Sequence, residues 1–421
     1  MMHAKISQTP RLLSKAAGKT TCCIFKAPSS LIEINGKSYQ PQIVSIGPYH
    51  RGEPHLQMIE EHKWRYLGSL LTRTQTIGIT LEDYLKSIHP VEIEARESYS
   101  ETIHLTHDEF LEMMVVDGCF ILELFRKVNN PKRFKLDDPL VTMAWILPFF
   151  YRDFLRLENQ IPFFILERLF EVTKLPEEVS GPSLSLLALR FFNTIMLRRD
   201  DVIESQFDLK GLHLLDLVRL SFIPPENELP QSGNTPTHLI HRVSKLRRSG
   251  IILNPSNADS LVVKFHHGVI EMPTINIDDF MTSFLVNCVA FEQCHNSRSK
   301  HLTTYATLLD CLVKTSKDVE YLCDRNIFQN YFGTDAEVAR FINNLGKDVA
   351  FDIDMCCLSK LFNDVNDYYL NSWHVQWSGF KYTHFDYPWW FISTLAASVL
   401  LLLAVAQTFY TIYGFYVKPN E

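Results

Sequence analysis

Apolar positions recur at helical spacing over most of this chain, and polar capping residues stand directly before several of these stretches. Thr80 with Asp83, and Thr106 with Glu109, have the spacing of capping boxes, in which two side chains satisfy backbone amides of a helix's first turn. The second box precedes an almost continuously apolar run, which indicates a helix buried on most sides. We therefore expect one large, mostly helical globular domain over residues 22–371.

Two short stretches carry a strand pattern instead of a helical one. Residues Ile34–Ile46 hold an Asn-Gly pair between apolar runs, which is a strong hairpin signal, and Val262–Met272 hold a turn signal at 267–268. The fold class predicted is mainly α, or α+β with two small β-hairpins. Between these stretches, residues 223–238 are rich in proline and polar side chains, which predicts an exposed loop.

Near the C-terminus, Trp389–Tyr410 contain no charged residue. As a helix this segment would be about 33 Å long, which exceeds the hydrocarbon thickness of a bilayer, about 30 Å. Aromatic residues cluster at both ends, as they do at membrane interfaces. We expect a single transmembrane helix over 388–412, with the lipid bilayer as its partner, after a juxtamembrane segment at 372–387 and before a short tail at 413–421.

Two small residues of this segment, Ser393 and Ala397, lie one helical turn apart. Small residues at this spacing let two membrane helices approach closely. A homo-oligomer that packs through these two positions is therefore one expectation.

The N-terminal residues 1–21 are basic and lack the apolar core of a secretory signal, so we expect a mobile tail. The nine cysteines form no CxxC pair, and no Asn-x-Ser/Thr site with a permissible middle residue occurs. These features favour a reducing compartment and a cytosolic globular part. The plasma membrane is the expected location, with an endomembrane as the alternative.

The net charge of −7 gives no general attraction to nucleic acid. The usual signatures of dinucleotide, phosphate-loop, nucleophile-elbow and zinc-protease sites are absent from the sequence. Paired candidates such as His266 with His267 point to opposite faces of a strand and are poor metal ligands. We therefore expect no metal, no cofactor and no enzymatic activity.

Polar residues inside apolar stretches are the candidate anchors or site residues. Asp117 stands in an apolar run, and Glu158, Asn159 and Gln160 stand just before Pro162. A buried carboxylate must find partners or shift its pKa, and a helix junction leaves backbone groups that such side chains can satisfy. We favour a structural role for all four, with a perturbed acid in a site as the alternative.

The turn that contains Gly47, Pro48 and His50 is a further candidate, because its backbone is flexible enough to approach a partner. The rival hypothesis to a binding protein is a membrane-associated hydrolase. In that case folding would bring Asp117 together with Glu158, or with His62, and two neighbouring carboxylates would divide acid and base roles.

Several segments together resemble one family, the plant domain-of-unknown-function 247 proteins, also called the uncharacterised plant 0481 family. The matching segments are Val44–His50, Glu61–Leu67, Val116–Leu124, Leu157–Phe163, Phe291–His295, Thr315–Val319, Pro388–Trp389 and Gln407–Tyr410. The resemblance implies a plant protein with one C-terminal membrane helix. It supplies no catalytic residues.

Some members of that family lie at grass self-incompatibility loci, where they are proposed as pollen-side recognition determinants. The function we expect is therefore a membrane-anchored recognition or signalling module that contacts an unknown protein partner. The expected contact surface consists of the Gly47–Glu53 turn and the loop at 223–238, because binding residues favour loops on a rigid scaffold.

Overall fold

The computed structural model describes residues 21–130, 138, 144–224, 238–295, 299–350, 356–370 and 388–416. The expected N-terminal tail up to residue 20, most of the expected loop, the juxtamembrane segment and the last five residues lie outside the described residues.

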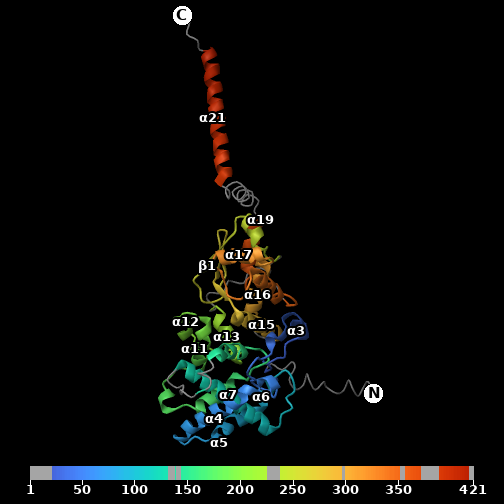
Figure 1. Cartoon of the computed structure of the whole chain (residues 1–421), viewed down its shortest axis with the longest axis vertical. Coiled ribbons are helices and arrows are strands. Elements are labelled where there is room, and N and C mark those ends of the chain that lie inside the picture. Colours follow the sequence, from blue (N-terminus) through green and yellow to red (C-terminus); the bar gives the residue numbers. More distant parts are fainter. Residues whose placement is uncertain are drawn as a thin grey trace, which may run out of the picture.

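The N-terminal half of the chain folds as a layered set of helices with no sheet among its described residues (Figure 1). Its centre is α7 (His107–Asn129), which contacts α4, α5, α10 and α11. The other elements are α3 (Ser29–Asn35), η1 (Gly36–Tyr39), η2 (Pro54–Leu56), α4 (Gln57–Gln75), α5 (Leu81–Ile88), η3 (His89–Val91), α6 (Glu92–Glu97), η5 (Ala144–Ile146), α9 (Leu147–Asp153), α10 (Phe163–Val172), η6 (Pro176–Glu178), α11 (Leu184–Met196), α12 (Asp200–Glu204) and α13 (Leu214–Phe222).

The expected capping boxes start their helices. The Thr106 hydroxyl accepts the Glu109 amide at the start of α7, and the Glu109 carboxylate accepts the Thr106 amide. Thr80 and Asp83 form the same box at α5. These caps explain why the helices begin where the polar pairs stand.

The C-terminal half combines helices with two small sheets. The first sheet has the strand order β1-β3-β2, from β1 (Ile252–Ser256), β2 (Lys264–His266) and β3 (Val269–Pro273). The second pairs β4 (Ile275–Ile277) with β5 (Phe328–Asn330) in parallel. The helices are α14 (Val243–Arg248), α15 (Asp279–Cys294), α16 (His301–Leu312), α17 (Ser316–Asp324), α18 (Asp335–Leu345) and α19 (Ser359–Leu370).

The hairpin expected at Val262–Met272 is confirmed in its central part. β2 pairs antiparallel with β3 across a turn at His267 and Gly268, whose φ angles are 49° and 82°. Two positive φ angles are what a tight hairpin turn of matching twist requires. β1 adds to the outer edge of β3 in parallel, which the sequence pattern did not predict.

The hairpin expected at Ile34–Ile46 is wrong, although the mainly helical fold class is confirmed. Gly36, with φ 58°, ends α3 and sends its amide to the Ile32 carbonyl. The positive φ that an Asn-Gly pair favours in a hairpin serves equally well to end a helix. The following stretch, residues 40–46, is not part of a strand, because carboxylate and amide side chains bind its backbone groups.

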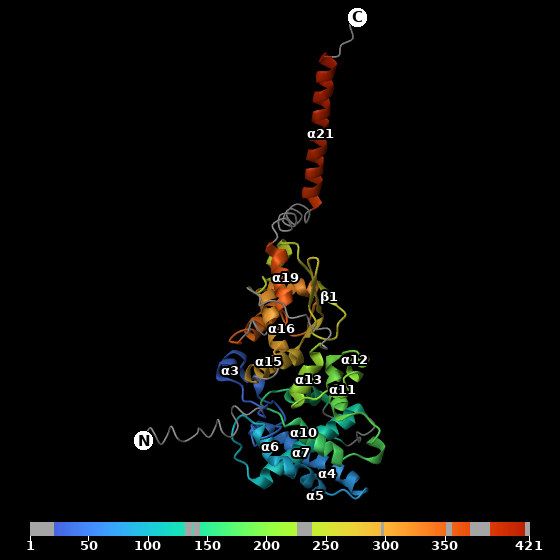
Figure 2. The same cartoon turned by 180° about the vertical axis from the view of Figure 1, so that it is seen from behind.

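The buried apolar side chains form two clusters. The first lies among the N-terminal helices and includes most of the buried face of α15; the second lies among α14, the sheets and α16–α19. Leu261, Met281 and Phe341 are partly buried against both clusters, so the two adjoin at α15. Figures 1 and 2 place the second cluster's elements between the N-terminal helices and α21.

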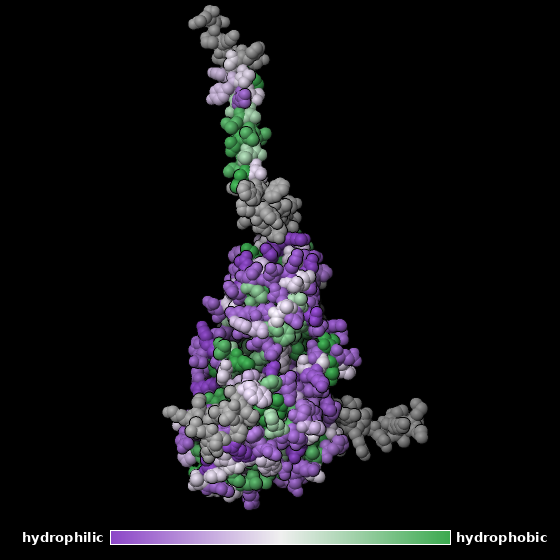
Figure 3. All heavy atoms as spheres, viewed as in Figure 1, coloured by the Kyte–Doolittle hydropathy of each residue, from purple (hydrophilic) through white to green (hydrophobic). Residues whose placement is uncertain are grey.

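The last element, α21 (Pro388–Tyr416), stands apart from the rest of the molecule (Figure 2). Its segment Ile392–Gly414 is long and apolar enough to cross a membrane, and none of its most apolar window is buried inside the protein. Figure 3 shows hydrophobic residues gathered along α21, while the visible face of the globular part is mainly hydrophilic.

Candidate functional site

Asp117 lies on the buried face of α7 and binds two groups from other parts of the chain. Its Oδ1 atom is 2.7 Å from the Lys63 ammonium, and its Oδ2 atom accepts the Gly47 amide at 2.8 Å. Asp117 is 3% exposed and Lys63 is 1% exposed. Lys63 also donates to the Ser45 carbonyl. The pair therefore ties α4 and α7 to the 45–47 backbone.

Gly47 is required at this position for two reasons. Its φ is 76°, in the left-handed region, and a Cβ atom there would lie 2.5 Å from the Gln160 carbonyl oxygen. Neither the conformation nor the space suits a side chain. The turn therefore fits closely against the segment that carries Glu158, Asn159 and Gln160.

The backbone of residues 42–46 is held by Asp153 and Asn159. One Asp153 oxygen accepts the amides of residues 42, 43 and 44 at 2.9, 2.8 and 3.2 Å. Asn159 accepts the Ile46 amide at 2.7 Å and donates to the Val44 carbonyl at 3.1 Å. These bonds replace the partner strand that the hairpin prediction assumed.

Asp153 was not among the residues singled out in the sequence, although it is fully buried. Arg156 donates to it from Nε at 2.9 Å, and Arg156 is also buried. Burial lowers the pKa of Arg156, while Asp153 acts against that shift. The signal available in the sequence was the charged pair Arg152 and Asp153, which follows soon after the apolar run that ends at Phe150.

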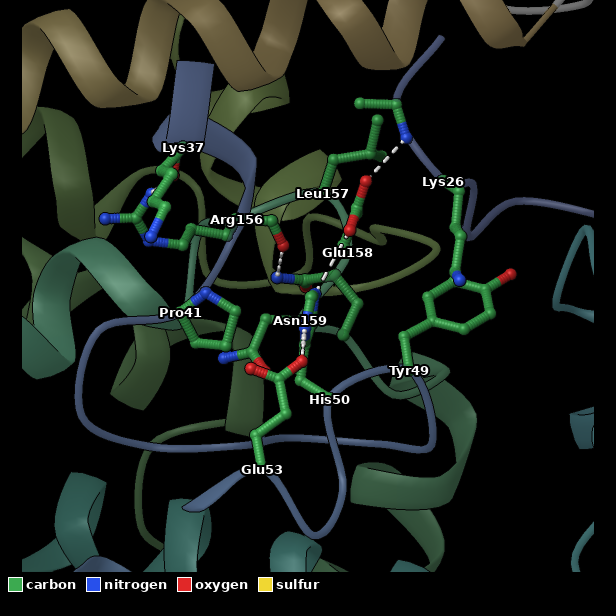
Figure 4. A network of polar contacts seen from close by, with 12 residues as sticks. Lys26, Lys37, Pro41, Tyr49, His50, Glu53, Arg156, Leu157, Glu158 and Asn159 are labelled. Carbon is green, nitrogen blue, oxygen red and sulfur yellow. Dashed lines mark hydrogen bonds and ion pairs between the residues drawn. The ribbon is translucent and has the colours of Figure 1, made fainter. Parts of the chain in front are cut away.

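Glu158 connects the segment before α3 to the turn that contains His50 (Figure 4). Its Oε1 accepts the Ala27 amide at 2.8 Å, and its Oε2 lies 3.1 Å from His50 Nε2. The other ring nitrogen of His50 lies 2.7 Å from Glu53. Burial opposes protonation of His50, but the hydrogen bonds to Glu158 and Glu53 outweigh it and raise the pKa of His50 above its ordinary value of 6.5.

Gln160 satisfies backbone groups on both sides of a helix junction. Its amide nitrogen donates to the carbonyls of Phe154 and Arg156 at 2.7 and 2.8 Å, and its side-chain oxygen accepts the Leu215 amide at 3.2 Å. Its own carbonyl accepts the Tyr99 hydroxyl at 3.0 Å. Such a side chain supplies the partners that helix ends lack.

The candidate residues Asp117, Glu158, Asn159 and Gln160 therefore bind backbone groups of neighbouring segments. They do not converge on a shared cavity. Asp117 and Glu158 have different partners, and neither lines the main cavities among the described residues. Both carboxylates are enclosed and bound to backbone amides and to a basic side chain. This geometry gives no support to a hydrolase that uses Asp117 with Glu158 or His62.

A second buried charge cluster was missed from the sequence. Arg219 of α13 donates to Asp216 at 2.9 Å and to Glu292 of α15 at 2.8 Å, and all three are fully buried. Glu292 also accepts the Thr303 amide at 2.7 Å. The cluster joins α13, α15 and the start of α16.

The largest of the main cavities is a groove between α4, α5 and α7, with a volume of about 650 Å³. Trp64, 50% exposed, and Leu81, 41% exposed, stand at its edge. Figures 1 and 2 place α4 and α5 at the end of the globular part opposite to α21. The apolar lining residues are Trp64, Leu67, Leu81, Leu85, Leu111, Val115 and Val116.

The turn at 47–53 reaches this groove at its tip. Gly47 and His50 are buried and Pro48 is half-buried, whereas Arg51 and Gly52 are exposed. Arg51 pairs with Glu112 of α7 at 3.2 Å, and Glu112 lines the groove. The internal bonds of the turn therefore hold Arg51 at the groove's rim.

Comparison with known proteins agrees with the motifs described above. The family model DUF247, described as a plant protein of unknown function, matches residues 24–403. The UPF0481 protein At3g47200 of Arabidopsis thaliana is 37% identical over 426 residues, which covers 96% of this chain and 88% of the relative. The putative UPF0481 protein At3g02645 of the same plant is 24% identical over 496 residues, covering 95% and 92%. No solved structure matches. This chain belongs to the plant DUF247 family.

Proposed function

We propose that this protein is a membrane-tethered recognition module that binds a protein partner through the groove between α4, α5 and α7, without catalysis. The observation that carries the proposal is the groove itself: an apolar channel of about 650 Å³ with a half-exposed tryptophan at its edge. Exposed tryptophans in apolar depressions are typical anchors of protein interfaces.

The partner that fits is a protein segment that presents apolar side chains, such as one face of an amphipathic helix. In helix-in-groove binding, apolar side chains from successive turns of one helix face enter a channel on the receptor. The lining carries both signs of charge, with Glu82, Asp108 and Glu112 beside Lys86, and His89 and His107 add polar rings. Mixed charges at a rim orient a polar helix face and do not select a polyanion such as nucleic acid.

The tether is α21. A helix that is exposed along its apolar length has no partner inside the described part of the protein, and a bilayer would cover it. A groove at the end opposite to α21 would face away from the lipid, where a partner from the aqueous phase has access.

The side of the membrane is part of the same proposal. None of the nine cysteines, all of which lie in the described ranges, forms a disulfide, and five of them are buried. This fits a reducing compartment and supports a cytosolic globular part. Protease treatment of sealed vesicles tests this placement. Digestion of the globular part from the cytosolic face supports it, and full protection with an accessible C-terminal tail contradicts it.

We propose the absence of catalysis because the buried carboxylates are already engaged in hydrogen bonds with the backbone. The carboxylates of Asp117, Asp153 and Glu158 each accept backbone amides that hold the chain in place. Groups engaged in this way support structure and are not available to a substrate.

Proximity labelling of the full-length protein in plant membranes tests the groove. We compare the wild type with Trp64→Glu, which places a charge in the groove, and with Trp145→Glu as the matched control. Trp145 is 58% exposed and lies on η5, outside the groove. The proposal expects proteins that are labelled by the wild type and by Trp145→Glu but lost in Trp64→Glu. An identical labelled set for all three would contradict it.

A further inference from the structure

A second cavity lies where the two hydrophobic clusters adjoin, with a volume of about 400 Å³. It is bounded by the end of α11, the segment before β2, β4, and the starts of α15 and α16. This volume falls within the usual range for small-molecule sites, about 300–1,000 Å³. Much of the wall is apolar, from Met196, Phe222, Phe280, Phe284, Leu285 and Leu302.

Two hydrogen-bond donors in this wall have no partner among the described residues. The Tyr305 hydroxyl is one; Tyr305 is only 2% exposed. The other is Nε of Arg198, whose two terminal nitrogens donate to the Ser221 hydroxyl and carbonyl at 2.9 Å. A buried donor without an acceptor is unfavourable, and two in one wall call for an explanation.

The acidic groups of the same wall are already engaged. Asp259 pairs with Arg199 at 3.0 Å, and Asp278 caps α15 by accepting the Met281 amide at 2.7 Å. Asn276 and Gln329 add amide side chains at the β4 side. The two buried atoms in this wall that lack a partner, the Tyr305 hydroxyl and Nε of Arg198, can therefore both donate a hydrogen bond to a ligand.

We infer that this cavity is a binding site for a small, mostly apolar molecule that carries a hydrogen-bond acceptor, with a carboxylate as the group that best matches Arg198 and Tyr305. A carboxylate accepts several hydrogen bonds and offsets the guanidinium charge. Burial lowers the pKa of Arg198 to about 10, so the side chain is still protonated at neutral pH. The apolar rings of Phe222, Phe280 and Phe284 would cover the rest of the ligand.

This site is separate from the groove of the proposed function, since the two share no lining residue. It sits between the two clusters, so an occupant would contact side chains of both. A ligand that binds only the folded chain raises its melting temperature by mass action. Occupancy is therefore measurable without any knowledge of the protein partner.

The probe is 2-naphthoate, and its uncharged counterpart is naphthalene-2-methanol. The full-length protein is held in phosphatidylcholine nanodiscs, and empty nanodiscs correct for partition of the probe into lipid. Affinity is measured by titration calorimetry and stability by thermal unfolding. We expect one saturable site for 2-naphthoate, a higher melting temperature, and weaker binding of the alcohol.

Three variants decide the location of that site. Tyr305→Phe removes only the unpartnered hydroxyl, so we expect affinity to fall about three- to tenfold with no loss of stability. Ala258→Trp fills the cavity from its partly exposed wall and should abolish binding. Tyr84→Phe is the control: its hydroxyl bonds to Thr74 at 2.7 Å outside the cavity, so stability should fall while affinity stays unchanged.

The inference is overturned by either of two results. One is no saturable binding of 2-naphthoate up to millimolar concentration. The other is saturable binding that Ala258→Trp and Tyr305→Phe leave at the wild-type affinity, which would place the probe elsewhere, as an adventitious additive only.

Discussion

The ammonium of Lys63 on α4 lies 2.7 Å from the carboxylate of Asp117 on α7, and both side chains are almost fully buried. The pair also binds backbone groups of the turn, through the Ser45 carbonyl and the Gly47 amide. Two buried charges are tolerated only when each is satisfied, as here. The most polar part of the N-terminal core thus fixes the conformation of one irregular segment.

Replacing Asp117 by Asn should destabilise the protein by about 2 kcal/mol, because the buried Lys63 would lose its fully buried carboxylate partner and keep only the more exposed Glu60, at 2.6 Å. Chemical unfolding of the full-length protein in nanodiscs measures this loss. Asp108→Asn, an exposed change on the first turn of the same helix, should have a much smaller effect. Equal stability of Asp117→Asn and the wild type would rule out the structural role.

Gly47→Ala should destabilise by about 3 kcal/mol, because strain at positive φ adds to a clash with the Gln160 carbonyl. Gly52 provides the matched control. Its φ is 85°, but a Cβ atom there would meet nothing within 4 Å. Gly52→Ala should therefore cost only the conformational part, about 1 kcal/mol. Thermal unfolding of both variants separates the close approach from the backbone strain, and equal losses would contradict the packing argument.

The His50 bonds predict a pH-dependent contribution to stability. The folded pKa of His50 is raised, so its contribution is fully present below pH 6.5 and is lost as the pH rises through the folded value. His50→Gln should cost about 2 kcal/mol at pH 6 and about 1 kcal/mol at pH 9. Unfolding free energies of wild type and variant at both pH values give the two differences, with His62→Gln as the control. A larger difference at pH 9 would have the wrong sign.

The contribution of His213 to stability changes with pH in the opposite direction to that of His50. Burial lowers the pKa of His213 to about 4, and its ring is held between the Cys23 carbonyl and the Asp216 amide, at 3.1 and 3.2 Å. The unfolded chain therefore binds one more proton between pH 6.5 and pH 4. Stability should fall by about 1.4 kcal/mol per pH unit from this group alone as the pH drops across that window. His213→Asn should flatten this acidic slope, and an unchanged slope would refute the assignment.

Ala397→Leu should weaken dimers of the full-length protein in membranes, if Ser393 and Ala397 form a close helix contact. We expect the crosslinked dimer fraction to fall about fivefold, which corresponds to a loss of about 1 kcal/mol. Ala406→Leu, on the opposite side of the helix by its spacing, is the control. Equal crosslinking in both variants would discard this interface.

Local signals predicted the fold well where they acted alone. The polar pairs at Thr80 and Thr106 started helices as expected, because a capping box is complete within four residues. The apolar length of α21 followed in the same way from composition. The hairpin predicted from Asn35-Gly36 was wrong, because a positive φ suits the end of a helix as well as a hairpin turn. The following backbone binds Asp153, more than 100 positions away, which a local sequence pattern does not reveal.

The candidate residues Asp117, Glu158, Asn159 and Gln160 were found because polar groups in apolar runs stand out. Their partners were not predictable, since Lys63 is 54 positions from Asp117 and Ala27 is 131 positions from Glu158. The groove was missed as well. Its apolar residues on α4, α5 and α7 resemble ordinary core positions until the helices are placed together.

In the proposed function, a protein partner occupies the groove at Trp64. The most direct measurement is the affinity of a purified partner, identified by the labelling experiment, for the full-length protein in nanodiscs. We expect Trp64→Ala to weaken binding about thirtyfold, as for an anchor residue worth about 2 kcal/mol, and Trp145→Ala to leave the affinity unchanged. Equal affinities for wild type and Trp64→Ala would contradict it.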